Sequence, residues 1–369
     1  MYRIVYWSCR RFLIIALYFK NMINLSQAAL ENLIIHRVGN KLLEESVLLS
    51  DEETDLSSQP DLPEILRTYF TSAFKEPVYY HFHHVSSLDL NEIYTIATAL
   101  FKSRKGFAKK SKDIANILYE YSNHPKIRGG ELYIAYFDAC IINNETTDAI
   151  GIFKSENREH YLKVFQEDAY FGVNHDEGIS LKRPDKACLI FNTKEDEGFR
   201  VCIIDTQNAG NEAQYWKDEF LKLKPVADNY YQTQNYLTLA KDFVTGRLDD
   251  EFEISKADQI DYLNRSINYF KKNEQFNEQD FANDVFEHQE VITSFKKFKG
   301  DFQNDNDLRV VSEFEISAQA VKRQSKVFKS VLKLDRNFHI YIHGDKELIE
   351  KGVDPDGRKY YKIYYREES

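Results

Sequence analysis

The chain has 369 residues, of which 43% are hydrophobic, so it is long enough for about two domains that each bury a core. Its formal net charge is -10, from 49 basic and 59 acidic residues, which argues against a protein that coats nucleic acid through bulk positive charge. Any anionic partner must therefore meet a local basic patch. The 4 cysteines form no Cys-x-x-Cys pair, which indicates buried free thiols in a reducing compartment and no cysteine metal site.

The first 21 residues read as an addition to the folded chain. Arg10 and Arg11 precede an apolar run, residues 12–19, that is far too short to span a membrane. The run lacks the small-residue cleavage pattern of a secretory signal, and Lys20 ends it. Conventional patterning begins just after Met22. We therefore predict that Met22 is the native start and that residues 1–21 are a non-native extension.

The N-terminal half mixes strands and helices without a regular βαβ order. Apolar periodicity and turn residues predict these elements: a hairpin over 30–38 and 42–49, a helix over 62–74, a strand over 78–84, two helices around 102–112, and strands over 132–142, 149–153, 187–191 and 199–204. This order favours an α+β fold, with a mixed or antiparallel sheet and helices in the N-terminal domain.

The densest basic run lies between the two predicted helices. Residues 102–112 hold six cations and no acid, although the chain as a whole is acidic. The second helix would bury Ile114, Ile117 and Leu118, which places Lys109 and Lys112 on its solvated face. Phosphate binding and simple solvent exposure are both open for this run. Its cations form the first half of the predicted nucleic-acid-binding set: Lys102, Arg104, Lys105, Lys109, Lys110 and Lys112.

The character of the chain changes after Asp205, where a polar loop leads into a mainly helical region. We place the domain boundary there, giving an N-terminal domain over 22–208 and a C-terminal domain over 209–369. Charge is segregated in the second domain. Residues 249–315 hold 17 acids and 8 bases, whereas residues 322–369 hold 12 bases and 8 acids. The helical region is therefore acidic, and the small antiparallel sheet predicted at the C-terminus is basic.

The sharpest pattern in the sequence runs from Lys326 to Arg366. It predicts three short strands, on which Phe338, Ile340 and Ile342 face inward as core. The outward face would carry cations among aromatic rings, as phosphate and single-strand binders do, or would be a solvated face stabilised by cross-strand pairs. The outward residues complete the predicted binding set: Lys329, Lys333, His339, Tyr341, Lys362 and Arg366.

Sequence motifs for enzymatic chemistry are absent. The chain has no phosphate-cradling glycine loop, no G-x-S-x-G and no H-E-x-x-H. His81 and His83 would share one side of a strand and could hold a metal ion, or they are polar histidines on a half-exposed sheet face. Asp205 could bind Mg²⁺ in a nuclease, but nothing at suitable spacing completes that site, so an acid that ends a strand is favoured. We predict no catalytic residue, no metal and no cofactor.

Five strings together resemble the bacterial nucleoid-associated protein family, in the version typical of Bacteroidetes-like sequences. The strings are residues 329–344, 186–192 and 212–217, with Gly129-Gly130 and the opening residues 29–36. The resemblance covers about Met22 to the C-terminus. It implies a cytoplasmic protein that associates with the bacterial nucleoid and binds DNA, without an established catalytic activity. No catalytic residue is carried over, because the strings are structural.

The leading hypothesis is therefore a non-enzymatic nucleoid-associated protein that binds DNA phosphates through local basic patches, with low sequence specificity. The alternative is an interaction module that docks on a DNA-handling enzyme through the acidic residues 249–315. A metal-dependent nuclease that uses Asp205 is a weaker alternative. A homodimer and a protein partner in DNA metabolism stay open, and no membrane association is expected.

Overall fold

The computed structural model describes residues 23–74, 77–168, 170–205, 215–252, 254–306, 308–328, 331–334 (backbone only at 331–333), 338–341, 348–365 and 367. The predicted start at Met22 and the predicted boundary after residue 208 lie outside these residues and stay predictions. By its internal contacts the chain divides into two compact units, Met1–Val226 and Ala227–Ser369. Helices and strands are both abundant, which confirms the predicted α+β fold class.

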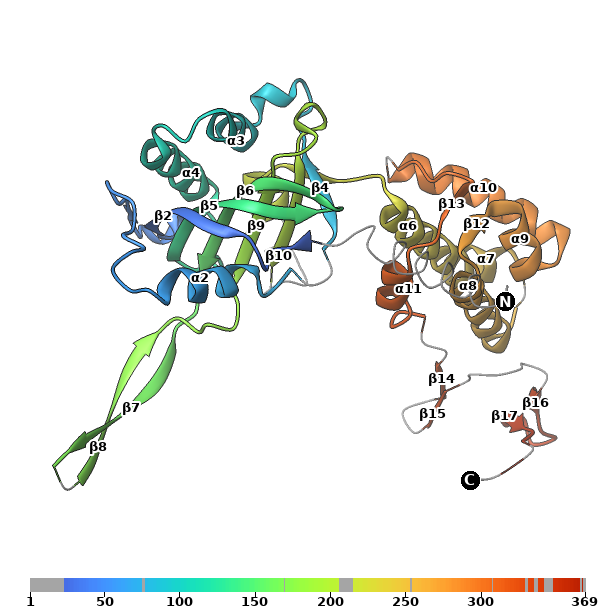
Figure 1. Cartoon of the computed structure of the whole chain (residues 1–369). Coiled ribbons are helices and arrows are strands. Elements are labelled where there is room, and N and C mark those ends of the chain that lie inside the picture. The colour runs from blue at the N-terminus through green and yellow to red at the C-terminus, as the bar shows by residue number, and fades with distance from the viewer. Residues whose placement is uncertain are drawn as a thin grey trace, which may run out of the picture. The chain divides into compact units, whose positions relative to one another are not determined.

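A nine-stranded antiparallel sheet forms the centre of the described part of the first unit (Figure 1). Its strand order is β11-β4-β10-β9-β6-β5-β2-β3, and β1 pairs with the far end of β5. The strands are β1 Ile23–Asn24, β2 Ala29–Val38, β3 Val47–Leu48, β4 Tyr79–Phe82, β5 Gly130–Ile142, β6 Glu145–Ser155, β9 Lys186–Phe191, β10 Arg200–Asp205 and β11 Leu223–Pro225.

Helices cover both faces of this sheet, with α3 and α4 on one face and α2 on the other (Figure 1). The central strands read as continuous apolar runs because both of their faces are buried. On one face they pack against Phe107, Leu118 and Trp216, and on the other against Tyr69 and Phe70. The helices are α2 Leu62–Thr71, α3 Glu92–Lys102, α4 Phe107–Tyr121, a π-helix Tyr215–Phe220, and 3-10 turns Lys41–Leu43, Leu88–Leu90 and Glu195–Glu197.

The predicted hairpin near the N-terminus is confirmed in part, because Arg37 pairs with Leu48 and Val38 with Val47. The second strand is only Val47–Leu48, since Lys41–Leu43, where it was predicted to begin, forms a 3-10 turn. A second, longer hairpin was not predicted. Strands β7 Glu159–Glu167 and β8 Tyr170–Gly178 pair over their whole length and project from the sheet between β6 and β9 (Figure 1). We call this element, residues 159–178, the arm.

The second unit is mainly helical, as predicted. Ser255 and Asp258 form a capping box at the start of α8, because each side chain accepts a hydrogen bond from the other residue's backbone N–H. Its elements are α6 Asn229–Asp242, a π-helix Phe243–Arg247, α7 Leu248–Glu251, α8 Lys256–Lys272, β12 Gln275–Asn277, α9 Glu278–Phe286, α10 Gln289–Asp305, β13 Glu313–Glu315, α11 Ala318–Gln324, β14 Val331–Leu334, β15 Phe338–Tyr341, β16 Ile349–Val353 and β17 Lys359–Ile363.

Aromatic rings form the core of the second unit. Phe276 lies on β12, stacked against Phe270 and Phe314 with ring centroids 5.2 and 4.6 Å away. Tyr236 of α6 and Phe281 of α9 close around the same ring. The high aromatic content of the sequence is therefore used in part to fill this core.

Two further observations bear on the class of protein. Cys140, Cys188 and Cys202 are buried and free, as predicted, and burial raises the pKa of the Cys140 thiol to about 12. Among the described residues, no helix combines the length and the apolar character that a membrane span needs.

Candidate nucleic-acid interface

The basic run 102–112 connects α3 to α4 and forms the first turns of α4. Asn91 caps α3, because its side chain accepts a hydrogen bond from the backbone N–H of Tyr94. The chain then turns at Gly106, whose φ of 75° lies in the left-handed region that favours glycine. Phe107 and Leu118 pin α4 to the sheet by burial. The apolar stripe of α4 therefore fixes which of its lysines reach solvent.

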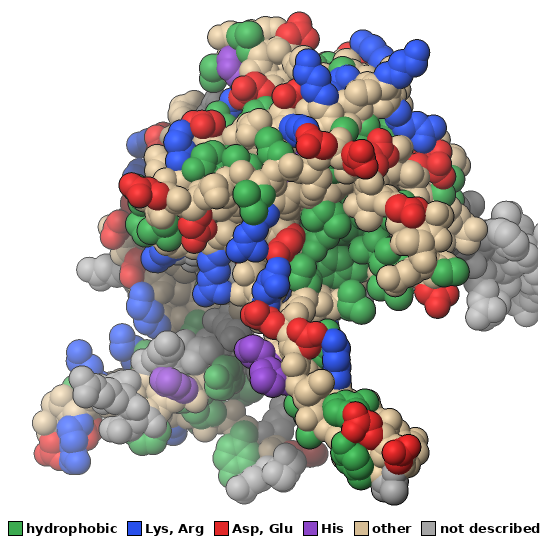
Figure 2. All heavy atoms as spheres, turned by 90° about the vertical axis from the view of Figure 1, so that its left-hand side faces the viewer, with side chains coloured by type: hydrophobic (Ala, Val, Ile, Leu, Met, Phe, Trp, Pro, Cys, Tyr) green, Lys and Arg blue, Asp and Glu red, His purple; other side chains and the backbone are tan. Residues whose placement is uncertain are grey.

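Acids from distant parts of the sequence surround three cations of this run. Lys102 lies 3.4 Å from the Glu195 carboxylate, and Lys112 forms an ion pair with Asp51. The Arg104 guanidinium lies 3.8 Å from Asp138, and it also stands over the Tyr136 ring. The run is free of acids in sequence, but not in space. Figure 2 shows basic and acidic side chains interspersed across this face of the first unit.

Lys105 and Lys109 differ from their neighbours, because among the described residues neither ammonium group has an acidic partner within ion-pair distance. Both side chains are exposed. The ammonium of Lys110 donates to the Lys105 backbone carbonyl at 3.2 Å. The first turn of α4 contains no acid, and Gly106 offers no side chain to cap it. The Phe107 N–H donates to the Arg104 carbonyl at 3.1 Å, but the positive end of the helix dipole still favours an anion here, so this corner of the run suits a phosphate.

The predicted C-terminal sheet is two separate hairpins within the described residues. Strand β14 pairs with β15, and β17 pairs with β16, a strand that was not predicted. Lys329, Arg366 and the side chain of Lys333 lie outside what the structure describes. His339 and Tyr341 are exposed on β15, as predicted. Lys362 is exposed too, but it lies 3.7 Å from the Glu350 carboxylate and over the Tyr364 ring.

The prediction that Phe338 belongs to the core is wrong, because its side chain is 63% exposed. Ile340 is partly buried, and Ile342 lies outside the described residues. Both hairpins pack on the same residue of α8, Ile260, through a small apolar set. Strand alternation alone overestimated the core here, since a two-stranded hairpin has one covered face only where another element lies on it. The apolar set is Leu334, Ile340, Ile349 and Tyr361.

The histidines of β4 have a cation for a neighbour. Lys224 of β11 lies directly across from His81. Partial burial lowers the pKa of His83, and the positive charge of Lys224 lowers it further. A lysine beside these rings opposes the binding of a metal cation, so the structure favours the reading as polar histidines on a half-exposed face. Within the described residues, no group of three or more His, Cys, Asp or Glu side chains could hold a metal ion.

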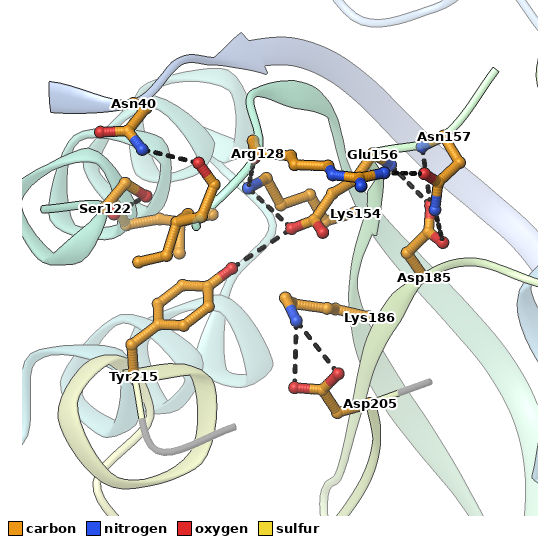
Figure 3. A network of polar contacts seen from close by, with 12 residues as sticks. Asn40, Ser122, Arg128, Lys154, Glu156, Asn157, Asp185, Lys186, Asp205 and Tyr215 are labelled. Carbon is orange, nitrogen blue, oxygen red and sulfur yellow. Dashed lines mark hydrogen bonds and ion pairs between the residues drawn. The ribbon is translucent and has the colours of Figure 1, made fainter. Parts of the chain in front are cut away.

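A buried charged network at one end of the sheet was not predicted (Figure 3). Lys154 of β6, Lys186 of β9 and Asp205 of β10 lie directly across from one another on adjacent strands. The Lys154 ammonium donates to the Glu156 carboxylate at 3.0 Å, and these side chains are 0% and 2% exposed. Burial lowers the pKa of Lys154, while the negative charge of Glu156 opposes that shift. The Tyr215 hydroxyl also donates to Glu156, at 3.3 Å.

Asp205 has a partner inside this network. It is the last residue of β10, and both of its carboxylate oxygens accept hydrogen bonds from Lys186 at 3.0 Å. Lys186 also lies over the Tyr215 ring, 5.2 Å from its centroid. The sequence signals for this network were a lysine beside each of two apolar runs, Lys154 and Lys186, and Asp205 at the end of a strand. Each ammonium is balanced by one carboxylate, so the arrangement is that of a structural ion-pair network.

His36 ties α4 to the sheet. It is buried on β2, where its Nδ1 accepts a hydrogen bond from the Ser50 backbone N–H at 3.1 Å. The proton must therefore be on Nε2, which lies 3.0 Å from the Ser111 hydroxyl on α4. Burial, together with the smaller effect of the nearby charge of Lys112, lowers the pKa of His36 to about 4. The neutral imidazole is thus the form that the fold accepts.

We expect this histidine to make the first unit sensitive to acid. In the unfolded chain its pKa returns to about 6.5, so the unfolded state binds more protons between pH 6.5 and 4. The contribution of neutral His36 to the free energy of unfolding is fully present above pH 6.5 and falls as the pH drops toward 4. From pH 7.5 to 5 the loss should be about 2 kcal/mol. Denaturant unfolding of the wild type and of His36→Gln at both pH values measures this loss of stability. If the two proteins lost the same free energy of unfolding between the two pH values, the prediction would be wrong.

A model of a known protein family matches most of the chain. Residues 34–358 match the family described as nucleoid-associated protein YejK. A search of curated proteins finds no match. The matched range contains most of the sheet of the first unit, the basic run, the arm and the helical core of the second unit.

Proposed function

The chain belongs to the nucleoid-associated protein YejK family, and from this premise we propose that it binds the phosphate backbone of DNA through the basic run at the start of α4. The binding is non-enzymatic and has low sequence specificity, because phosphates are the same at every base pair. This proposal places the protein in the cytoplasm, on the bacterial nucleoid.

The observation that carries the proposal is the pair of exposed ammonium groups on Lys105 and Lys109, beside the uncapped start of α4. Among the described residues, neither ammonium group has an acidic partner within ion-pair distance. A DNA phosphate can therefore bind them without displacing a carboxylate of the protein. Two ammonium groups and a helix N-terminus act on the same phosphate or on neighbouring ones.

The other cations of the predicted set contribute less in this proposal. Lys102, Arg104 and Lys112 each face an acid, and a phosphate must compete with that acid. Exposed ion pairs are worth only about 0–1 kcal/mol, so such an exchange is permitted, but it yields less than a contact to an unpaired cation. His339, Tyr341 and Lys362 form a secondary surface on the C-terminal hairpins. Lys329, Lys333 and Arg366 belong to the same proposal by sequence alone.

Binding of a short DNA duplex should weaken as salt rises, and the double variant Lys105→Gln/Lys109→Gln should have a shallower dependence. Each phosphate contact contributes about -0.9 to the slope of log affinity against log salt. Losing two contacts should therefore change the slope by about 2 and weaken binding similarly for unrelated duplex sequences. Fluorescence anisotropy at several salt concentrations measures both quantities.

The matched control removes the same two charges elsewhere, at Lys41 and Lys256, each of which faces an acid within the protein. It should keep the wild-type slope. Equal slopes in wild type and in Lys105→Gln/Lys109→Gln would overturn the proposed site. Wild-type protein that ignores DNA at low salt, yet co-purifies with a DNA-handling enzyme, would favour the interaction module with its acidic residues 249–315.

A further inference from the structure

The arm is an addition to the sheet, since its flanking strands β6 and β9 already pair with each other. Nine residue pairs, from Glu159 with Gly178 to Glu167 with Tyr170, form its ladder without a bulge. Every residue of β7 is exposed. A two-stranded hairpin is at best marginally stable in water by itself, so an ordered arm of this length indicates that something covers it.

On one face of the arm, side chains of β7 and β8 contact each other. The Phe165 ring lies against Gly172, where an added Cβ would come within 2.5 Å of it. Lys163 lies 2.6 Å from the Asp176 carboxylate. Lys163 also stands over the Tyr161 ring. On this face, which we call the closed face, the large side chains Tyr161, Phe165 and Tyr170 are 46%, 39% and 58% exposed, less than the apolar side chains of the opposite face.

The opposite face, the open face, holds an apolar stripe that touches solvent. Val164 and Val173 lie directly across from each other at its centre, and their side chains are 68% and 63% exposed. Leu162 on the side of the base and Phe171 on the side of the tip are both 74% exposed. Figure 2 shows hydrophobic side chains on the arm, which projects at its lower right. Four large apolar side chains in one stripe are a typical signature of an interaction surface.

Charge decides what this stripe can bind. The arm holds one lysine and five acids, a formal net charge of -4, so DNA is repelled. Three of the acids, Glu159, Glu167 and Asp176, lie on the closed face, and Asp168 lies in the turn. Among the strand residues only Glu177 places an acid on the open face, directly across from His160. A second open face can therefore approach without strong repulsion.

The neck of the arm is held firmly. The Asp185 carboxylate accepts hydrogen bonds from the backbone N–H of Glu156 at 2.6 Å and of Asn157 at 3.0 Å (Figure 3). The Asn157 side chain donates to the same carboxylate at 2.6 Å, and Arg128 donates to Asn157. These bonds fix how the arm leaves the sheet, which lowers the entropy cost of presenting it to a partner.

We propose that the open face of the arm packs against the open face of a second copy of this chain, in a two-fold dimer. A symmetric interface requires that a surface complement itself, and an uncharged stripe centred on Val164 and Val173 meets that requirement. Whether the second arm lies parallel or antiparallel to the first, a two-fold axis through this centre brings Val164 and Val173 of one copy against the same two valines of the other. Four apolar side chains per copy make a small interface, so the dissociation constant should be micromolar.

The test compares two substitutions at adjacent positions on opposite faces. Val173→Asp places a carboxylate in the centre of the open face, and Asn174→Asp places the same charge on the closed face. Sedimentation equilibrium from about 1 to 200 µM should show a monomer–dimer equilibrium for the wild type and for Asn174→Asp. Val173→Asp should weaken association by at least about tenfold. Unchanged thermal unfolding would show that the sheet and its cores are intact in both variants.

Three outcomes would overturn the proposal. The wild type could stay monomeric at the highest concentration, which would leave the stripe for a different protein. Association could survive Val173→Asp, which would place the dimer contact on another surface. The two variants could weaken association equally, which would make the effect one of net charge. DNA binding plays no part in this test, so its result is independent of the proposed function.

Discussion

Replacing Lys154 with alanine is expected to destabilise the first unit by about 3–5 kcal/mol. The substitution leaves the Glu156 carboxylate buried without its counter-ion. The free-energy cost of an unpaired buried charge is far larger than the contribution of an exposed ion pair. The Arg128 carbonyl, which accepts from Lys154 at 2.6 Å, loses its donor as well. Denaturant unfolding can be followed through the buried Trp216, in a background where Trp7 is replaced by phenylalanine.

Two further variants test whether the stability lost by Lys154→Ala comes from the buried ion pair. Lys163→Ala removes an exposed ion pair on the arm and should cost less than about 1 kcal/mol. Lys154→Met/Glu156→Gln removes both buried charges, and it should recover much of the stability that Lys154→Ala loses. If Lys154→Ala were as mild as Lys163→Ala, the network would be open to water, and its description as buried would be wrong.

Replacing Phe276 with alanine should destabilise the second unit by about 3–5 kcal/mol. The ring is 1% exposed and lies between Phe270 and Phe314, so truncation leaves a cavity that its stacked neighbours fill only in part. Far-UV circular dichroism during denaturation reports this loss, because the unit is mainly helical.

Phe338→Ala is the matched control, since the same side chain is lost from a strand. Sequence alternation predicts a core position for Phe338, but the structure exposes it. Its removal should therefore change the free energy of unfolding by no more than about 0.5 kcal/mol. A large effect at Phe338, or a small one at Phe276, would contradict the packing of this unit.

Local patterns determined most of the elements. Helical spacing of apolar residues located α2 and α4, because a helix places residues at that spacing on one face. The apolar run after Gly129-Gly130 gave β5. The arm was missed, because its strands do not alternate cleanly between polar and apolar residues.

The candidate interface could be predicted only in part. The sequence located the basic run, yet it could not tell Lys105 and Lys109 from Lys102 and Lys112, since the acids that face the latter come from residues far away in the chain. It located the C-terminal strands, yet not the additional strand β16 that pairs with β17. Nor could it predict that Phe338 lacks a covering element.

By itself the sequence determined the fold class, the family, the basic run and the buried cysteines, because each follows from patterns within a few consecutive residues or from composition. Only the tertiary structure decided which charges meet. Strand pairing brought Lys154, Lys186 and Asp205 into one row, and the packing of α4 on the sheet left Lys105 and Lys109 exposed, with no acidic partner among the described residues. Electrostatic contacts depend on distances in space, and those are set by long-range pairing that no local pattern encodes.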